Sequence, residues 1–212
     1  MQLGGGNVEE LPEFRWTAKA GKREAILASA FEVFHQKGFY QAKIEEIAQR
    51  AGVGKGTVYL YFSSKEHLLR EMLKEVVHHY LSMLRQRMAA APTPRERLHV
   101  LFRTHAAFVR RHQKVKFLTR RDFDFVDEEL HQWLRQQREA FVQELQALVE
   151  DGIRAGQFRP VDARLAALML EALLGTLLFE EKTFTKKEMQ PFLDILERGI
   201  LAESGINYHT IF

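Results

Sequence analysis

The sequence contains no cysteine, which excludes a disulfide scaffold, a zinc site with cysteine ligands and a cysteine nucleophile. It also has only 5 prolines and 13 glycines in 212 residues, and strand-type alternation is scarce. A hydrophobic share of 46%, with 16 phenylalanines, is sufficient for an extended core. Because helix-forming residues fill the segments between the few helix breakers, the composition predicts an all-α protein.

Long apolar runs are also missing. The most apolar segment, residues 162–182, is interrupted by Arg164 and Glu171, so its runs are shorter than the roughly 18 residues that a membrane span needs. Residues 1–14 carry three glutamates and no basic residue, so they lack the basic start of a signal peptide. We therefore expect a cytoplasmic protein with no membrane partner and a flexible N-terminal arm over residues 1–14.

Patterns typical of catalytic and metal sites are absent as well. None of the 9 histidines is followed by another four residues later, so no His-x-x-x-His pair is available to hold zinc on a helix. No serine lies in a Gly-x-Ser-x-Gly motif. We predict that the protein is not an enzyme and uses no metal and no cofactor; an enzyme is the weaker rival hypothesis.

Positive charge is concentrated in one short segment. The net charge of the chain is only +3, but residues 15–65 hold nine Lys and Arg against four Glu, which gives +5. Residues 66–212 hold 22 basic and 21 acidic residues. A local excess of positive charge is the electrostatic footprint expected of a DNA-binding surface. A solvated basic face gives the same count, so charge alone leaves both interpretations open.

Hydrophobic periodicity predicts a series of helices. Apolar residues at three- and four-residue spacing mark helices over residues 19–37, 43–50, 55–61 and 63–88. Gly38 is suited to end the first helix, and Ser63 with Glu66 forms a capping box at the start of the fourth. After a break at residues 89–94, further helices are predicted over residues 94–112, 114–122, 126–155, 162–182 and 186–203. The helix over 162–182 is apolar almost all round, so it should be buried on every side, in part by a second subunit.

The most informative segment is residues 44–62, with the sequence IEEIAQRAGVGKGTVYLYF. Two short amphipathic helices flank a turn that carries Gly52, where a positive φ is least unfavourable. Ala48 is small where the two helices must approach closely, while Val53 and Val58 close a small core. The second helix then exposes ammonium, hydroxyl and aromatic groups that can reach base edges and phosphates in a major groove. The segment is therefore predicted to be a helix-turn-helix.

The sequence from Ala51 to Glu66, AGVGKGTVYLYFSSKE, resembles the signature of the TetR family of transcriptional regulators. The resemblance covers about residues 22–75. Ala42 and Lys43 depart from it, since the family usually has Thr or Ser there to cap the second helix. Gly54 departs where Ser often caps the recognition helix. The DNA-binding residues that the resemblance implies, with Lys43 as an electrostatic substitute for a lost hydroxyl, are Lys43, Lys55, Gly56, Thr57, Tyr59, Tyr61 and Lys65.

The resemblance also implies the domain organisation. We expect an all-α fold in which a three-helix helix-turn-helix DNA-binding domain over residues 15–65 precedes a helical-bundle domain over residues 66–212. The second domain would bind the effector and dimerise, with the helices over 162–182 and 186–203 of each subunit forming a four-helix bundle. The expected interface residues are Leu168, Ala172, Gly175, Leu193 and Leu196.

A small-molecule effector is expected to bind among the aromatic residues of this second domain. Between His105 and Phe125, aromatic residues interleave with arginines, which suits a hydrophobic or amphipathic effector with an anionic head. The expected effector-binding residues are Phe102, His105, Phe108, Phe117, Arg120, Phe123, Trp133, Phe141 and Phe179. Ordinary core packing of the aromatic residues is the alternative.

These observations predict a TetR-type, ligand-responsive transcriptional regulator. It would be a repressor that binds palindromic, double-stranded operator DNA as a homodimer and is released by its effector. A ligand-independent DNA-binding or architectural protein is the alternative hypothesis. The two share the first 65 residues and differ in whether the C-terminal bundle holds a cavity or serves only as a dimer scaffold.

Overall fold

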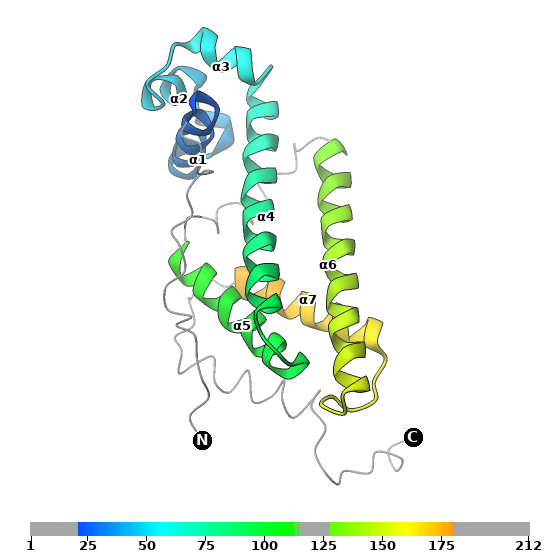
Figure 1. Cartoon of the computed structure of the whole chain (residues 1–212). Helices are drawn as coiled ribbons and strands as arrows, with labels where there is room; N and C mark the ends of the chain where they lie inside the picture. Colours follow the sequence, from blue (N-terminus) through cyan, green and yellow to red (C-terminus); the bar gives the residue numbers. More distant parts are fainter. Residues whose placement is uncertain (1–20, 113, 115–127, 180–212) are drawn as a thin grey trace. The chain divides into compact units, whose positions relative to one another are not determined.

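The computed structural model describes residues 21–112, 114 and 128–179, in which the regular elements are seven α-helices (Figure 1). They are α1 (Lys22–Gln41), α2 (Ile44–Arg50), α3 (Lys55–Tyr61), α4 (Lys65–Ala89), α5 (Pro94–Arg111), α6 (Glu128–Arg154) and α7 (Ala163–Phe179). The predicted all-α class is confirmed. The predicted helices over 114–122 and 186–203 lie outside the described residues, apart from residue 114. None of the described helices is both long and apolar enough to cross a membrane.

The chain divides into two compact units. We call the first the headpiece unit; its described residues fall within 10–83 and 112–135. The second, the bundle unit, comprises residues 84–111 and the described residues from 136 onward. The division falls inside α4 and inside α6, whereas the sequence suggested a DNA-binding domain that ends at residue 65. The reason is that Leu68, Met72 and Val76, on the first half of α4, belong to the core of the headpiece.

The core of the headpiece unit is built from one face of each of its helices. Ile26, Ala30 and Phe34 on α1 are at most 1% exposed and pack with Ile47 of α2 and Val58 of α3. In Figure 1, α1, α2 and α3 lie around the N-terminal end of α4. Burial of a large apolar side chain stabilises a fold by about 1.5–3 kcal/mol, so this core fixes how the short helices are held. Leu130, in the first turn of α6, is also fully buried in it.

The last turn of α1 is bent at Gly38. Its φ of 74° and ψ of 166° are not helical and lie in a region that only glycine adopts readily. The bend confirms the predicted end of the straight helix at this residue. The carbonyl of Gly38 then accepts the N–H of Ala42, and Phe39 turns into the core at 8% exposure. The bend thereby sets the direction in which the chain enters α2.

The bundle unit is organised around α5. This helix is buried over most of its circumference, with Leu101, Phe102, Thr104 and His105 all 0% exposed, and it packs against α7. The turn between α6 and α7 is closed by the carbonyl of Gly152, which accepts the N–H of Phe158. A Cβ added at Gly152 would lie 2.1 Å from the Phe158 ring, so only glycine fits there.

α7 is only partly buried within one chain. Leu165 and Met169 are 58% and 59% exposed, and Ala172 is also exposed. These residues recur at spacings of four and three, so they form one stripe along the helix. Ala167 and Leu170, on the opposite face, are fully buried. One apolar stripe of α7 thus faces solvent in the single chain, and its expected burial by a second subunit stays a prediction.

Candidate nucleic-acid interface

The segment Ile44–Tyr61 forms a helix-turn-helix. The chain leaves α2 with N–H groups of Ala51 and Val53 donating to the carbonyls of Ile47 and Ala48, at 2.9 and 3.0 Å. Gly52 has a φ of 67°, which confirms the predicted left-handed position in the turn. Gly54 precedes α3 with extended backbone, and its carbonyl accepts the N–H of Thr57 at 2.9 Å. The turn is thus closed by backbone hydrogen bonds alone.

α3 exposes an unusual amount of apolar and aromatic surface. Tyr59, Leu60 and Tyr61 are 46%, 85% and 44% exposed, whereas Val58 is fully buried and anchors the helix. Lys55 and Gly56 are exposed as well, and Thr57 is half-buried. Exposed aromatic rings beside hydroxyl and ammonium groups are typical of a helix that enters a DNA groove.

The sequence analysis did not single out two exposed residues, Leu60 and Tyr40. Tyr40 is 72% exposed and lies between the bend of α1 and the start of α2. The sequence did contain a signal that could have identified Leu60, since it is a large apolar residue between two tyrosines on a helix of seven residues. Tyr40 follows the buried Phe39, and neighbouring residues near a bend point to different sides.

The two short helices lack side-chain caps at the positions where the sequence departs from the family pattern. Neither Lys43, at the N-cap of α2, nor Gly54, at the N-cap of α3, makes a side-chain capping hydrogen bond. A missing cap lowers stability by about 1 kcal/mol. Lys43 is exposed and forms no ion pair within the described residues, which leaves its ammonium available for an anion.

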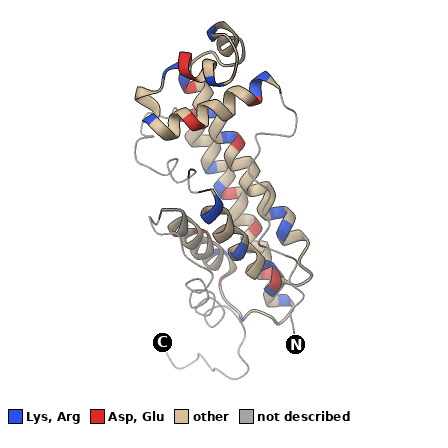
Figure 2. Ribbon diagram, turned by 90° about the vertical axis from the view of Figure 1, so that its left-hand side faces the viewer, with Lys and Arg blue, Asp and Glu red and all other residues tan. Residues whose placement is uncertain are grey.

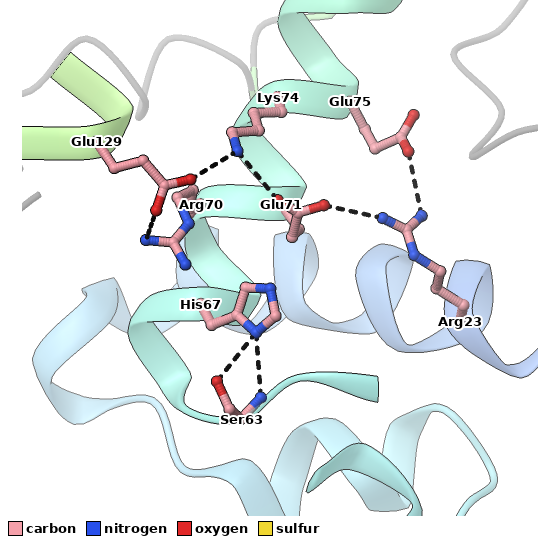
Figure 3. A network of polar contacts seen from close by, with 8 residues as sticks. All are labelled: Arg23, Ser63, His67, Arg70, Glu71, Lys74, Glu75 and Glu129. Carbon is pink, nitrogen blue, oxygen red and sulfur yellow. Dashed lines mark hydrogen bonds and ion pairs between the residues drawn. The ribbon is translucent and has the colours of Figure 1, made fainter. Parts of the chain in front are cut away.

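The start of α4 differs from the predicted capping box. Ser64, not Ser63, caps the helix, since its Oγ accepts the N–H of His67 at 3.1 Å. The reciprocal bond comes from His67 rather than Glu66: Nδ1 of its ring accepts the backbone N–H of Ser63 at 3.1 Å (Figure 3). With two serines in a row, the second one takes the capping geometry and helix α4 begins at Lys65.

Lys65 is held by the end of α1. Its Nζ donates to the carbonyls of Phe39, Tyr40 and Ala42 at 2.8, 3.3 and 3.1 Å and lies 4.4 Å from the centroid of the Phe39 ring. An ammonium has three N–H groups, and these carbonyls match that number. The predicted phosphate contact of Lys65 therefore stays a prediction that requires one of these bonds to be exchanged.

Replacement of Lys65 by Met is expected to destabilise the protein by roughly 1–3 kcal/mol, because three carbonyls then lose a charged donor. The free energy of unfolding in urea measures the loss. Lys37→Met is the matched control: Lys37 bonds only Glu46, at 2.6 Å, in an exposed pair that is worth about 1 kcal/mol or less. Equal losses in the two variants would contradict a structural role for Lys65.

A polar network joins α1, α4 and the start of α6 within the headpiece unit (Figure 3). Arg23 of α1 bonds Glu71 and Glu75 of α4, at 3.2 and 3.1 Å. Glu129 of α6 in turn bonds Arg70 and Lys74 of α4, at 3.0 and 3.3 Å. Further ion pairs of the headpiece, among them Lys37 with Glu46 and Lys55 with Glu45, also set acids beside bases. Figure 2 accordingly shows both charges on the short helices at the top of the view.

The predicted effector residues are distributed over both units. Phe102, His105 and Phe108 of α5 and Phe141 of α6 are all buried in the bundle unit. Trp133 instead packs against the core of the headpiece unit. Phe117, Arg120, Phe123 and the side chain of Phe179 lie outside the described residues.

Two polar side chains interrupt the apolar surroundings of α5. The hydroxyl of Thr104 is fully buried and has no hydrogen-bond partner in the described part of the chain. The ring of His105 is fully buried beside it and donates to the carbonyl of Leu174 on α7. Burial lowers the pKa of His105 to about 4, against which the bond to Leu174 acts only in part. At neutral pH this imidazole is therefore uncharged.

The predicted interface residues lie along α7 where they are described. Ala172 is exposed, Leu168 and Gly175 are half-buried, and Leu193 and Leu196 are outside the described residues. Among the described residues, no group of three His, Asp or Glu side chains could hold a metal ion.

Comparison with known proteins identifies both parts of the chain. Residues 26–72 match the family described as "Bacterial regulatory proteins, tetR family", and residues 91–177 match "Tetracyclin repressor-like, C-terminal domain". The fatty acid metabolism regulator protein of Bacillus subtilis is 26% identical over 184 residues, which are 86% of this chain and 93% of that protein.

Solved structures give the same result. The fatty acid degradation regulator FadR from Bacillus halodurans is 25% identical with a TM-score of 0.69, over 85% of this chain and 96% of that one. FadR from Bacillus subtilis in complex with stearoyl-CoA is 25% identical with a TM-score of 0.64, over 73% of this chain and 84% of that one. The helix-turn-helix, the helical C-terminal part and these matches together establish that the chain belongs to the TetR family of transcriptional regulators.

Proposed function

We propose that this regulator is a repressor that binds a palindromic operator as a homodimer and leaves it when a fatty acyl thioester binds. The observation that carries the DNA-binding part is the exposed face of α3, where Tyr59, Leu60 and Tyr61 surround the buried anchor Val58. The proposed groove and phosphate contacts are Lys43, Lys55, Gly56, Thr57, Tyr59 and Tyr61, all of which are exposed except Thr57, which is half-buried.

The proposed homodimer is supported by the stripe on α7. Leu165 and Met169 are, apart from four residues of the headpiece, the large hydrophobic residues that the described chain exposes. An apolar stripe on the surface is covered when a second copy packs against it. Two-fold symmetry of the dimer would then match a palindromic operator, whose half-sites lie about one turn of DNA apart or a little more.

The proposed effector class rests on the bundle unit and on the relatives. The buried face of α5, with Phe102, Leu101 and Phe108, is apolar and suits an acyl chain, while Thr104 and His105 add two polar groups. A structure of the Bacillus subtilis relative contains stearoyl-CoA. A neutral His105 and an unpaired hydroxyl fit the uncharged thioester better than a free carboxylate, whose charge would be costly to bury.

The direct test is a selection on random duplex DNA with the purified protein, followed by a gel shift on the enriched sequence. We expect a palindrome to be enriched and acyl-CoA esters of increasing chain length to release it, with free CoA and free fatty acids as controls. Enrichment without release by any ester would contradict the proposed effector. Failure to enrich any sequence, with salt-sensitive binding to all DNA, would instead favour an architectural protein.

Replacement of Tyr59 by Ala is expected to weaken binding to the selected operator by about 10- to 100-fold, since a side chain that reads bases contributes about 1–3 kcal/mol. Binding to unrelated DNA should change little. Gel shifts on both DNAs measure the ratio. Tyr40→Ala is a suitable control, because Tyr40 is also an exposed tyrosine but lies outside α3. Equal losses on both DNAs would exclude a base-reading role for Tyr59.

A further inference from the structure

An acidic residue, Glu45, lies on the proposed DNA-binding surface and forms an ion pair with a basic residue of that surface, Lys55. Nζ of Lys55, the first residue of α3, is 2.5 Å from Oε1 of Glu45 on α2. The side chains are 53% and 58% exposed. The same ammonium lies 5.9 Å from the centroid of the Tyr59 ring. Glu45, Lys55 and Tyr59 therefore form one exposed cluster that spans the two helices of the motif.

This pair is not explained by stability. Exposed ion pairs contribute little to folding, and both side chains lie largely in solvent. A carboxylate at a DNA-facing surface also repels phosphates. The hydrogen bond with Lys55 lowers the pKa of Glu45, and the same bond raises the pKa of Lys55. Both groups are thus charged at neutral pH, so the cluster presents an acceptor and a donor side by side.

The order of these groups fits a guanine–cytosine base pair best. In the major groove, guanine presents two adjacent acceptors, O6 and N7, and its partner cytosine presents the N4 donor next to O6. Lysine is a common partner of O6 and N7, and glutamate accepts from cytosine N4. An adenine–thymine pair also has a donor, N6, for the carboxylate, but this donor separates the two acceptors, so the ammonium finds one acceptor there in place of the two of guanine.

We propose that Glu45 and Lys55 act as one unit that specifies a guanine–cytosine base pair in each half-site of the operator, with Lys55 on guanine and Glu45 on cytosine. This inference rests on the proposed DNA-binding function. On the free protein, Glu45 would neutralise Lys55, which weakens the attraction to unrelated DNA. The repulsion between Glu45 and the phosphates would be offset only where cytosine N4 can donate a hydrogen bond to Glu45.

The test compares the sequence preference of the wild-type protein with that of Glu45→Ala. Both proteins are subjected to selection on random duplex DNA, and their affinities are then measured for the selected operator and for a copy in which the guanine–cytosine pair is exchanged for adenine–thymine. We expect the wild-type protein to prefer the original operator by about 10-fold at this pair. The Glu45→Ala variant should lose most of that preference and bind unrelated DNA more tightly.

The matched control is Glu46→Ala, which removes the same charge from the next residue of α2. Glu46 bonds Lys37 at 2.6 Å, away from the Lys55 cluster. Loss of preference at one symmetric pair with Glu45→Ala and not with Glu46→Ala supports the proposal. An unchanged preference, or an equal gain in affinity for all sequences with both variants, would overturn it. Thermal unfolding of each variant establishes that it is folded.

The failure of the inference and the failure of the proposed function give different results. If the wild-type protein enriches a palindrome but Glu45→Ala enriches the same palindrome with the same base preferences, the reading role of Glu45 is refuted and operator binding stands. If the wild-type protein enriches nothing, specific DNA binding itself is refuted.

Discussion

A shift from pH 7 to pH 5 is expected to destabilise the folded protein by about 2 kcal/mol through His105 alone. Its pKa is lowered to about 4 in the folded protein, from an ordinary value of 6.5, because the ring is fully buried in the bundle unit. Between these two pKa values the unfolded chain binds a proton that the folded chain does not. Stability is therefore complete above pH 6.5 and is lost as the pH falls towards 4.

Urea unfolding at a series of pH values, for the wild-type protein and for His105→Gln, measures this effect. Glutamine can still donate to the carbonyl of Leu174 but does not titrate, so the variant should lose about 2 kcal/mol less than the wild-type protein over the same pH range. His35→Gln is the control, because His35 is an exposed histidine. If His105→Gln and the wild-type protein show the same acid dependence, His105 is not the buried neutral group that we describe.

The helix-turn-helix could be predicted from the sequence because its determinants are local. Gly52 adopts the left-handed turn, and the small Ala48 and the anchor Val58 occupy the buried positions that their size and spacing indicated. These residues lie within about ten positions of each other. The chain therefore closes the same small core whatever lies beyond it.

The details that depend on distant segments could not be predicted in the same way. Lys65 has the sequence context of a phosphate-binding residue, yet its donors reach carbonyls at the end of α1, 23 to 26 residues earlier. Trp133 belongs by sequence to an aromatic-rich bundle, but it packs against the core of the headpiece. The pairing of Glu45 with Lys55 needs the turn between α2 and α3 to be in place.

The exposed stripe of α7 shows a third kind of limit. A helix with apolar residues on every side is compatible with burial inside one chain or between two chains, and the sequence alone does not divide its faces. In the structure, Ala167 and Leu170 mark the face of α7 that one chain buries, and Leu165 and Met169 mark the face that it leaves exposed. The division itself indicates which residues to change in order to separate folding from association.

Replacement of Met169 by Glu is expected to convert the proposed dimer into monomers and to weaken operator binding by about 100-fold or more. Met169 is 59% exposed, so the acid is tolerated in a folded chain, but a charge buried between two copies of α7 is strongly unfavourable. A monomer binds each half-site separately and loses the gain of roughly 10²- to 10⁴-fold that linked sites provide. Sedimentation and gel shifts on the selected operator measure both effects.

Ala147→Glu is the matched control, because Ala147 is an exposed residue of α6 in the same unit and receives the same charge. It should remain dimeric and bind the operator as the wild-type protein does. If thermal unfolding shows that Met169→Glu is folded, and the variant is monomeric and binds the operator weakly, the interface lies on the α7 stripe. If that variant stays dimeric with unchanged affinity, the second subunit covers another surface, and the exposure of Leu165 and Met169 needs a different partner.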